Sequence, residues 1–261
     1  MNDRPTSFIW YELMTSDTKA AKAFYSEVVG WDTRAFESSG HDYTILEAQE
    51  RGVGGLMAIP PEAREAGARP CWIGYIAVGD VDAVAARIEA AGGTVHKDIM
   101  DIPGVGRIAM VSDPQGAPFY LIAPTGEDQP PAPPMTPGHV GWHELHSSDW
   151  EAAFAFYSGE FGWAKAEAMD MGPMGTYQLF TAGGDPEAKE NWIGGMMNAN
   201  TLGRPAWLFY FIVGDIDAAA TRVGSAGGQV LNGPMEVPGG AWIVQCRDPQ
   251  GAMFALVGLR G

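Results

Sequence analysis

The stretch WYELMTSDTKAAKAFYSEVVGW at residues 10–31 recurs as WHELHSSDWEAAFAFYSGEFGW at residues 142–163, so the second copy begins 132 positions after the first. Further matches follow in the same order at an offset of 135, and they end with the turn Asp113–Gly116 and its counterpart Asp248–Gly251. Ordered matches over this length indicate a tandem duplication of one structural unit.

Each copy follows the same order of predicted elements. The alternating strand Phe8–Met14 is followed by Asp17, a residue type that favours helix N-caps, and by a helix that Gly30 ends. A later strand, Trp72–Val78, precedes Asp80, which is expected to cap a second helix. The other predicted strands are residues 42–48, 53–59, 94–98, 106–112 and 117–123, with a loop from Pro60 to Pro70.

The duplication divides the chain into residues 1–125 as a first module, 126–138 as a linker and 139–261 as a second module. Six prolines lie between Ala123 and His139. A proline-rich segment extends by about 3 Å per residue. We therefore expect an extended spacer between the modules.

The composition excludes several classes of partner. With 16 Lys and Arg residues against 32 Asp and Glu residues, the net charge is −16, which disfavours nucleic acid and anionic membranes as partners. No apolar run is long enough to span a membrane and no signal peptide is visible, so we expect a soluble, cytoplasmic protein. Cys71 and Cys246 occupy different places in the two copies and are interpreted as buried thiols.

Four motifs carry a family resemblance: the alternating first strand, the Asp-initiated helix with Ala-x-x-Phe-Tyr and Gly-Trp, the Val-x-Asp-Val/Ile-Asp start of the second helix, and the Asp-Pro-x-Gly turn. Together they resemble the vicinal oxygen chelate superfamily, over nearly the whole chain and twice. The resemblance implies an α+β fold of tandem paired βαβββ modules, which form a half-open eight-stranded barrel around a small-molecule or metal site. Members include glyoxalase, extradiol dioxygenases, fosfomycin-modifying enzymes and metal-free proteins that sequester antibiotics, so the fold alone does not define the chemistry.

The positions that hold metal ligands in metal-dependent relatives are changed here. They carry Trp10 and Tyr120 in the first copy, and Trp142 and Ala255 in the second. A divalent ion needs nitrogen or oxygen lone pairs at about 2.0–2.2 Å, which indole and methyl groups do not supply. We therefore expect no metal ligands and no metal cofactor.

Three of the five histidines, His139, His143 and His146, lie close together in the sequence. On a strand, His143 and His146 point to opposite faces, and His139 lies about 13 Å from His143. This spacing does not suit a zinc site. We interpret them as surface or rim histidines that titrate near neutral pH.

Glu12 and Glu144 are the candidate catalytic residues, one in each copy. The alternation of the strand places them on the same face as Trp10 and Trp142. A carboxylate among apolar aromatic groups is expected to have a raised pKa and to act as a general base. The alternative is a structural carboxylate that binds neighbouring backbone or an arginine.

Aromatic and thioether side chains on the predicted strands suit a planar, hydrophobic or cationic ligand. For each of them the alternative is ordinary core packing, which also applies to Met110, Met196 and Met197. The candidate ligand-binding residues are Trp10, Tyr43, Met57, Tyr75, Tyr120, Trp142, His146, Tyr177 and Tyr210.

The sequence favours a metal-free protein that binds a small aromatic or hydrophobic molecule in a cavity between the paired sheets. One alternative is a lyase, isomerase or hydroxylase with Glu12 or Glu144 as base; another is a metal-dependent glyoxalase-like or dioxygenase-like enzyme with unusual ligands. A structural or protein-interaction role is the third. The sequence leaves open the ligand, the module that carries the site, and the choice between monomer and homodimer.

Overall fold

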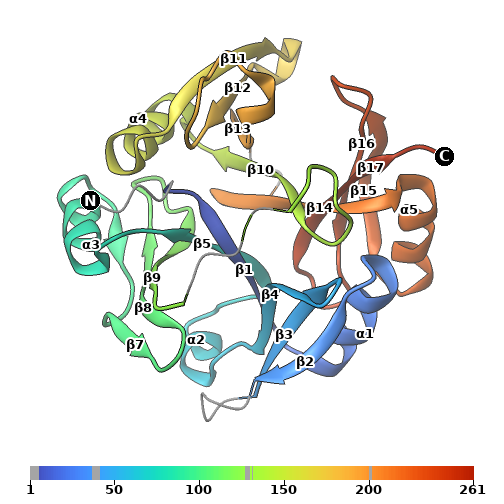
Figure 1. Cartoon of the computed structure of the whole chain (residues 1–261), viewed down its shortest axis with the longest axis horizontal. Helices are drawn as coiled ribbons and strands as arrows, with labels where there is room; N and C mark the ends of the chain where they lie inside the picture. The colour runs from blue at the N-terminus through green and yellow to red at the C-terminus, as the bar shows by residue number, and fades with distance from the viewer. Residues whose placement is uncertain (1–5, 37–41, 127–129, 131, 200–201) are drawn as a thin grey trace. The chain divides into compact units, whose positions relative to one another are not determined.

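The chain forms two compact units, each built from both copies of the duplicated sequence. The computed structural model describes residues 6–36, 42–126, 130, 132–199 and 202–261 (Figure 1). Unit 1 comprises Met1–Ile9, Ile73–Asp128 and His143–Trp207, and unit 2 comprises Trp10–Trp72, Gln129–Trp142 and Leu208–Gly261. Each unit therefore pairs part of the first copy with part of the second.

Unit 2 contains most of two βαβββ modules. The strand order is β2-β3-β4-β1 in one and β14-β17-β16-β15 in the other, and only β1–β4 and β14–β17 are parallel pairs. The elements of the first are β1 (Phe8–Thr15), α1 (Thr18–Val28), β2 (Asp32–Phe36), β3 (Tyr43–Ala48) and β4 (Arg51–Ala58), followed by the short α2 (Pro61–Glu65). Those of the second are β14 (Ala206–Asp215), α5 (Ile216–Ser225), β15 (Gln229–Glu236), β16 (Trp242–Arg247) and β17 (Met253–Leu259).

Unit 1 repeats this plan. Its strand orders are β5-β9-β8-β6, with β7 paired to β8, and β11-β12-β13-β10; β5–β9 and β10–β13 are the parallel pairs. The first group consists of β5 (Cys71–Ala77), α3 (Val81–Ala90), β6 (Thr94–Val95), β7 (Met100–Ile102), β8 (Gly106–Ser112) and β9 (Pro118–Pro124). The second consists of β10 (Val140–Ser147), α4 (Trp150–Phe161), β11 (Ala164–Asp170), β12 (Thr176–Thr181) and β13 (Gly194–Asn198), with the 3-10 turns η1 (Gly172–Met174) and η2 (Lys189–Asn191).

The four modules confirm the predicted α+β class and the tandem βαβββ organisation. In each, a strand and a helix precede an antiparallel group whose last strand returns parallel to the first. The module boundaries at residues 125 and 139 stay a prediction, because the units follow the packing of the modules instead of the order of the copies.

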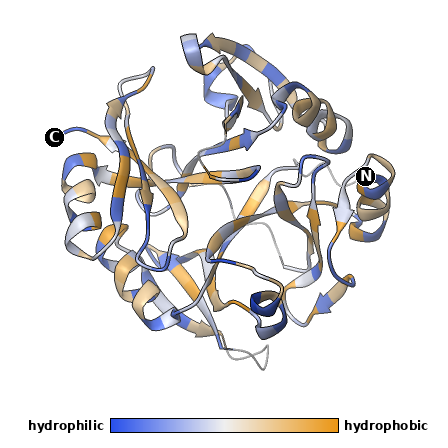
Figure 2. Cartoon of the chain, turned by 180° about the vertical axis from the view of Figure 1, so that it is seen from behind, coloured by the Kyte–Doolittle hydropathy of each residue, from blue (hydrophilic) through white to orange (hydrophobic). Residues whose placement is uncertain are grey.

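The helices α1, α3, α4 and α5 start where predicted, and an aspartate caps each of them. Asp17, Asp80, Asp149 and Asp215 each accept a hydrogen bond from the backbone N–H three residues later, at 2.9–3.0 Å, which satisfies an amide that has no partner within the helix. Many strand residues are hydrophobic, whereas the helices carry both hydrophobic and hydrophilic residues (Figure 2). The buried residues of α3 are the predicted stripe of Val81, Val84, Ala85 and Ile88.

A buried chain of three side chains links the two copies within unit 1. Tyr157 on α4 donates a hydrogen bond from its hydroxyl to Asp113 Oδ2 at 3.2 Å and accepts one from Trp207 Nε1 at 3.0 Å. The other carboxylate oxygen of Asp113 accepts from the backbone N–H of Gln115 and Ala117. The Asp-Pro-Gln-Gly turn of one copy is thereby bound to a helix of the other.

Unit 2 contains the equivalent chain. Tyr25 on α1 donates to Asp248 Oδ2 at 3.1 Å and accepts from Trp72 Nε1 at 2.8 Å. We name these two sets the Trp–Tyr–Asp chains. Helices also pair within each unit, α3 with α4 and α1 with α5 (Figure 1).

Three predictions about loops need correction. The predicted strand 94–98 is only the two-residue β6, and the loop Pro60–Pro70 contains α2. The end of the linker is not extended: Thr136 Oγ1 donates to Pro133 O at 2.6 Å, and Gly138 N donates to Ile212 O at 2.8 Å. Proline fixes its own φ but leaves its carbonyl free to accept, so a following hydroxyl can close a turn.

Some predictions concern residues outside the described ranges or single side chains. Pro131 and residues 127–129 of the linker lie outside the described part of the chain. Both cysteines are free; Cys246 is buried, and burial raises the pKa of its thiol to about 12, whereas Cys71 is only half-buried, contrary to prediction. Within the described ranges, the helices are too short or too polar to cross a membrane.

The Trp–Tyr–Asp chains make a specific stability prediction. Tyr157→Phe removes the hydroxyl and leaves the indole N–H of Trp207 and one oxygen of Asp113 buried without this partner. We expect the free energy of unfolding, measured with urea, to fall by roughly 1–3 kcal/mol. Ser158→Ala, which removes a hydroxyl from the next position of α4, is the control and should change it by less than about 0.5 kcal/mol. Equal losses would contradict a special role for the Tyr157 hydroxyl.

Candidate functional site

A glutamate, a histidine and a tyrosine form a hydrogen-bonded cluster in unit 1. Glu144 and His146 lie two residues apart on β10, so their side chains share one face of the strand. His146 Nε2 lies 2.6 Å from Glu144 Oε1, and the Tyr177 hydroxyl on β12 donates to Glu144 Oε2 at 3.0 Å. An ionised carboxylate only accepts, so His146 donates through Nε2 in that state. Glu144 and His146 are both buried, with 6% and 2% exposure.

Gly195 of β13 makes room for this cluster. Tyr177 lies opposite Met197 in the β12–β13 register, and a Cβ on Gly195 would overlap the Tyr177 ring. Any side chain at Gly195 would therefore displace the tyrosine from Glu144. The first copy has the same requirement at Gly55, because a Cβ on Gly55 would overlap Tyr43.

The first copy carries a related cluster in unit 2. Trp10 Nε1 donates to the Tyr43 hydroxyl at 3.0 Å, Tyr43 lies opposite Met57, and Glu12 is buried on β1. At the offset of 132, the position of His146 is occupied by Met14. The two copies therefore share the glutamate and the tyrosine, and only the second adds an imidazole.

Two further tyrosine groups lie on the other modules. In unit 1 the rings of Tyr75 and Tyr120 stack with centroids 4.4 Å apart and planes 8° apart. In unit 2 Gln245 Nε2 donates to the Tyr210 hydroxyl at 3.0 Å, and Tyr210 lies opposite Ala255. The sequence analysis missed Gln245, although it occupies the position of Met110 in the second copy and the offset of 135 was a sufficient signal.

The structure thus brings together some of the predicted residues and separates others. Direct contacts or strand pairing join three groups: Glu144 with His146 and Tyr177, Trp10 with Tyr43 and Met57, and Tyr75 with Tyr120. Trp142 is half-buried on β10, two residues before Glu144. Glu12 and Glu144 belong to different units, so they are two separate candidates.

The prediction of surface histidines was wrong for His143 and His146, which are both buried, and the prediction of titration near neutral pH was wrong for His143. His143 stacks on Phe8, with ring centroids 4.9 Å apart and planes 11° apart, and its Nδ1 lies 2.7 Å from Ile193 O. Burial lowers the pKa of His143 to about 4. The error arose because both faces of β10 are buried: one carries His143 and the other the Glu144–His146 pair.

The residues at the family's metal-ligand positions do not fit a divalent ion. The Trp10 indole is a donor to Tyr43, Tyr120 stacks on a ring, and Ala255 offers a methyl group. Elsewhere in the described ranges, no three His, Cys, Asp or Glu side chains are grouped so that they could hold a metal. The indole and methyl groups at these positions supply no lone pairs for a divalent ion.

Comparison with known proteins gives a family match over both copies. The profile of the Glyoxalase/Bleomycin resistance protein/Dioxygenase superfamily matches residues 7–121 and 136–256. The "Putative glyoxylase CFP32" of Mycobacterium tuberculosis (strain CDC 1551 / Oshkosh) is 34% identical over 251 residues, covering 95% of this chain and 93% of that protein. The "Anthracycline biosynthesis protein DnrV" of Streptomyces peucetius is 32% identical over 268 residues, covering 98% and 94%.

Solved structures share the fold at lower identity. The Mn(II)-bound glyoxalase from Novosphingobium aromaticivorans superposes with a TM-score of 0.66 at 18% identity, covering 98% of this chain and 82% of that one. The 2,3-dioxygenase LapB from Pseudomonas sp. KL28 gives 0.65 at 12% identity, covering 99% and 94%. These likenesses support the fold alone.

The pKa of His143 predicts a pH dependence of stability. Because the folded pKa is about 4 and the ordinary value is 6.5, only the unfolded chain takes up this proton as the pH falls between these values. The unfolding free energy of wild type should therefore fall by roughly 3 kcal/mol, because of this residue, as the pH drops from 6.5 to 4. Above pH 6.5 this residue should cause no change. His143→Phe keeps a ring against Phe8. Its unfolding free energy, measured with urea, should fall less than that of wild type as the pH is lowered from 6.5 to 4. Parallel pH profiles for the two proteins would contradict the assignment.

Proposed function

The chain belongs to the Glyoxalase/Bleomycin resistance protein/Dioxygenase superfamily, and we propose that it binds a small aromatic or hydrophobic molecule through its tyrosine groups without the help of a metal ion. The observation that carries the proposal is the change at the metal-ligand positions. There the chain has Trp10, Tyr120 and Trp142, all half-buried aromatic side chains.

Stacked and hydrogen-bonded aromatic groups are suited to a planar ligand. The Tyr75–Tyr120 stack offers a ring face, and each favourable ring pair is worth about 0.5–1.5 kcal/mol beyond the buried area. Tyr43 in unit 2 and Tyr177 in unit 1 each offer a phenol oxygen that accepts a hydrogen bond from a ligand hydroxyl. Both phenols already have fixed partners, Trp10 and Glu144, so the hydroxyls are oriented before a ligand arrives.

The relatives narrow the ligand class. Two proteins that are 31% and 32% identical over 98% of this chain are named for anthracycline biosynthesis. Anthracyclines are polycyclic aromatic compounds with hydroxyl and carbonyl groups, which is the chemistry that stacked tyrosines and fixed phenols recognise. We therefore propose a neutral or cationic hydroxylated polycyclic aromatic ligand, since a net charge of −16 disfavours an anion.

The test is calorimetric titration with anthracycline aglycones. We expect Tyr120→Ala to weaken binding by about tenfold, which corresponds to the loss of one ring contact of about 1.4 kcal/mol. Treatment with a chelator, and later addition of Zn, Ni, Mn or Fe(II), should leave the affinity unchanged.

Trp242→Ala is the matched control. Trp242 is a half-buried aromatic residue of β16, and in the alternation of that strand it lies on the opposite face from Gln245. This variant should bind as wild type does. Loss of binding after chelation, with recovery on adding one metal, would instead indicate a metal-dependent site.

A second candidate function rests on the Glu144–His146 contact. A buried carboxylate that is held by a histidine and a tyrosine resembles the arrangement of a general base with its orienting partners. In this proposal Glu144 takes a proton from a carbon next to a carbonyl or hydroxyl group, as a lyase or isomerase requires, while His146 and Tyr177 fix the carboxylate by hydrogen bonds.

The assay for this candidate is isomerisation of the hemithioacetal of methylglyoxal and a small thiol to the thioester, chosen because a relative is named a glyoxylase. Glu144→Gln keeps the shape and removes the base, so we expect kcat to fall by about a hundredfold or more. Glu167→Gln, an exposed glutamate of β11 in the same unit, should retain full activity. Absence of thioester formation by wild type, or equal activity of wild type and Glu144→Gln, would rule out Glu144 as the base in this reaction.

A further inference from the structure

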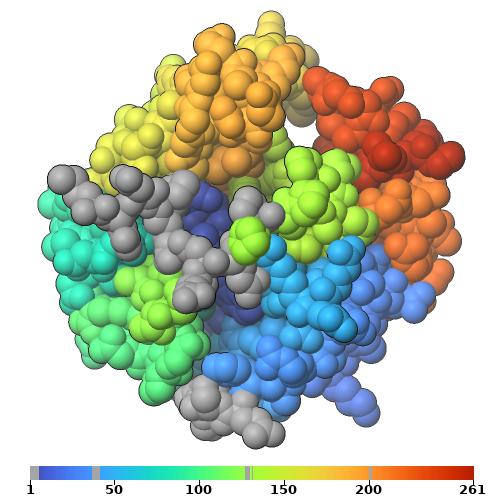
Figure 3. Space-filling model, in the orientation of Figure 1, coloured from blue at the N-terminus to red at the C-terminus, as the bar shows by residue number. Residues whose placement is uncertain are grey.

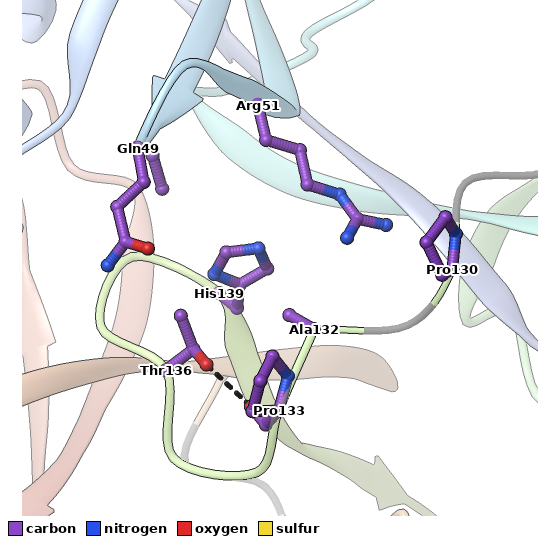
Figure 4. A pocket seen from close by; sticks show the side chains of 8 residues that line it. Gln49, Arg51, Pro130, Ala132, Pro133, Thr136 and His139 are labelled. Carbon is purple, nitrogen blue, oxygen red and sulfur yellow. Dashed lines mark hydrogen bonds between the residues drawn. The ribbon is translucent and has the colours of Figure 1, made fainter.

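A cavity of about 280 Å³, with a mixed polar and apolar lining, lies in unit 2 between the β3–β4 hairpin and the segment that precedes β10 (Figure 4). Gln49 and Arg51 enter it from the hairpin, and Thr136 and His139 from the segment just before β10, with Pro130 and Pro133 as apolar walls. We propose that this cavity binds a small organic carboxylate, with Arg51 and His139 as its polar contacts.

Arg51 is a cation that has no counter-ion among the residues that the structure describes. No ion pair or hydrogen bond joins its side chain to the described residues, although the chain carries 32 acidic residues against 16 basic ones. The guanidinium extends into the space between Gln49, His139 and Pro130 (Figure 4). A guanidinium donates two parallel hydrogen bonds to a carboxylate, which makes it suited to this class of ligand.

His139 supplies a second polar group without a protein partner. Both of its ring nitrogens are buried and make no hydrogen bond within the described residues. Leaving a buried polar group without a partner is destabilising, and a ligand oxygen that accepts from the imidazole removes this penalty. The position is fixed by backbone bonds, since Ile212 N donates to His139 O at 2.8 Å.

The hairpin turn holds Gln49 and Arg51 toward the cavity at a conformational cost. Gln49 and Glu50 have φ angles of 51° and 64°, a left-handed conformation that is uncommon for residues other than glycine. Two-residue hairpin turns with this geometry favour Asn-Gly or Gly-Gly. Strain of this kind is concentrated at functional sites, where it fixes the direction of side chains.

The duplicated fold does not require these residues. The hairpin that corresponds to β3–β4 in the second copy, β12–β13, is joined by the much longer segment 182–193. The residue that corresponds to His139 at the offset of 132 is Ser7. Residues 132–140 nevertheless lie against the β3–β4 region, visible as lime green beside blue (Figure 3). The cavity is therefore a feature of one copy, which separates it from the tyrosine groups that both copies share.

The size and walls of the cavity indicate the rest of the ligand. A volume of about 280 Å³ is on the order of ten times that occupied by one water molecule, which suits a carboxylate with a ring or short chain. The proline rings give the apolar part of such a ligand a surface to pack against. Inorganic phosphate offers the same oxygens to Arg51 but no apolar group, so it serves as the comparison.

Titration of the full-length protein with benzoate, followed by imidazole NMR, tests the proposal. The chain has five histidines, and His139→Gln identifies the His139 signals. We expect those signals to shift saturably with benzoate, and Arg51→Gln to raise the Kd by about tenfold or more, as for the loss of a charged hydrogen-bonding partner. Arg64→Gln, which removes an exposed arginine of α2, should leave the Kd unchanged.

A lysine variant and the comparison with phosphate test the Arg51 site further. Arg51→Lys keeps the charge without the planar fork; it should bind benzoate more weakly than wild type and replaces Arg51→Gln if that variant does not fold. Saturation by phosphate but not benzoate would overturn the organic carboxylate, and no shift of His139 with either anion would overturn the site. Arg51→Gln should bind aromatic aglycones as wild type does, so failure of this proposal is distinct from failure of the tyrosine site.

Discussion

The structure depends on a buried hydrogen bond between a tyrosine of one copy and an aspartate of the other. Tyr157 donates to Asp113 in unit 1, and Tyr25 donates to Asp248 in unit 2. Burial raises the pKa of Asp113 and Asp248, so each carboxylate is ionised at a cost that its backbone and tyrosine partners offset. Because the partners come from different copies, neither copy alone satisfies its own turn aspartate.

Two tryptophans also form hydrogen bonds from one copy to the other. The Trp31 indole donates to Gly138 O in unit 2, and the Trp163 indole donates to Thr6 O in unit 1. Each tryptophan holds the backbone just before the first strand of the other copy. The motifs Phe-Tyr, Gly-Trp and Asp-Pro-Gln-Gly therefore recur because the fold uses each of them twice, and they say nothing by themselves about the ligand.

Local signals in the sequence were sufficient for most of the fold. The four aspartate caps, the stripe of α3 and the glycine stops depend on residues within one helix, so periodicity and capping chemistry predicted them. The partners of Tyr25 and Tyr157 are distant in the sequence, and no local pattern specifies them. The prediction for His143 failed for the same reason. Phe8, which covers its ring, lies more than a hundred residues earlier in the sequence.

Where the two copies carry different side chains, the shared fold does not require either residue. Glu144 and Tyr177 have counterparts in Glu12 and Tyr43, but His146 replaces Met14, an exchange of an apolar thioether for an imidazole in direct contact with a carboxylate. A buried Glu–His pair costs more desolvation than the Glu–Met pair of the other copy, which folds in the same way. The shared fold therefore does not require an imidazole at this position.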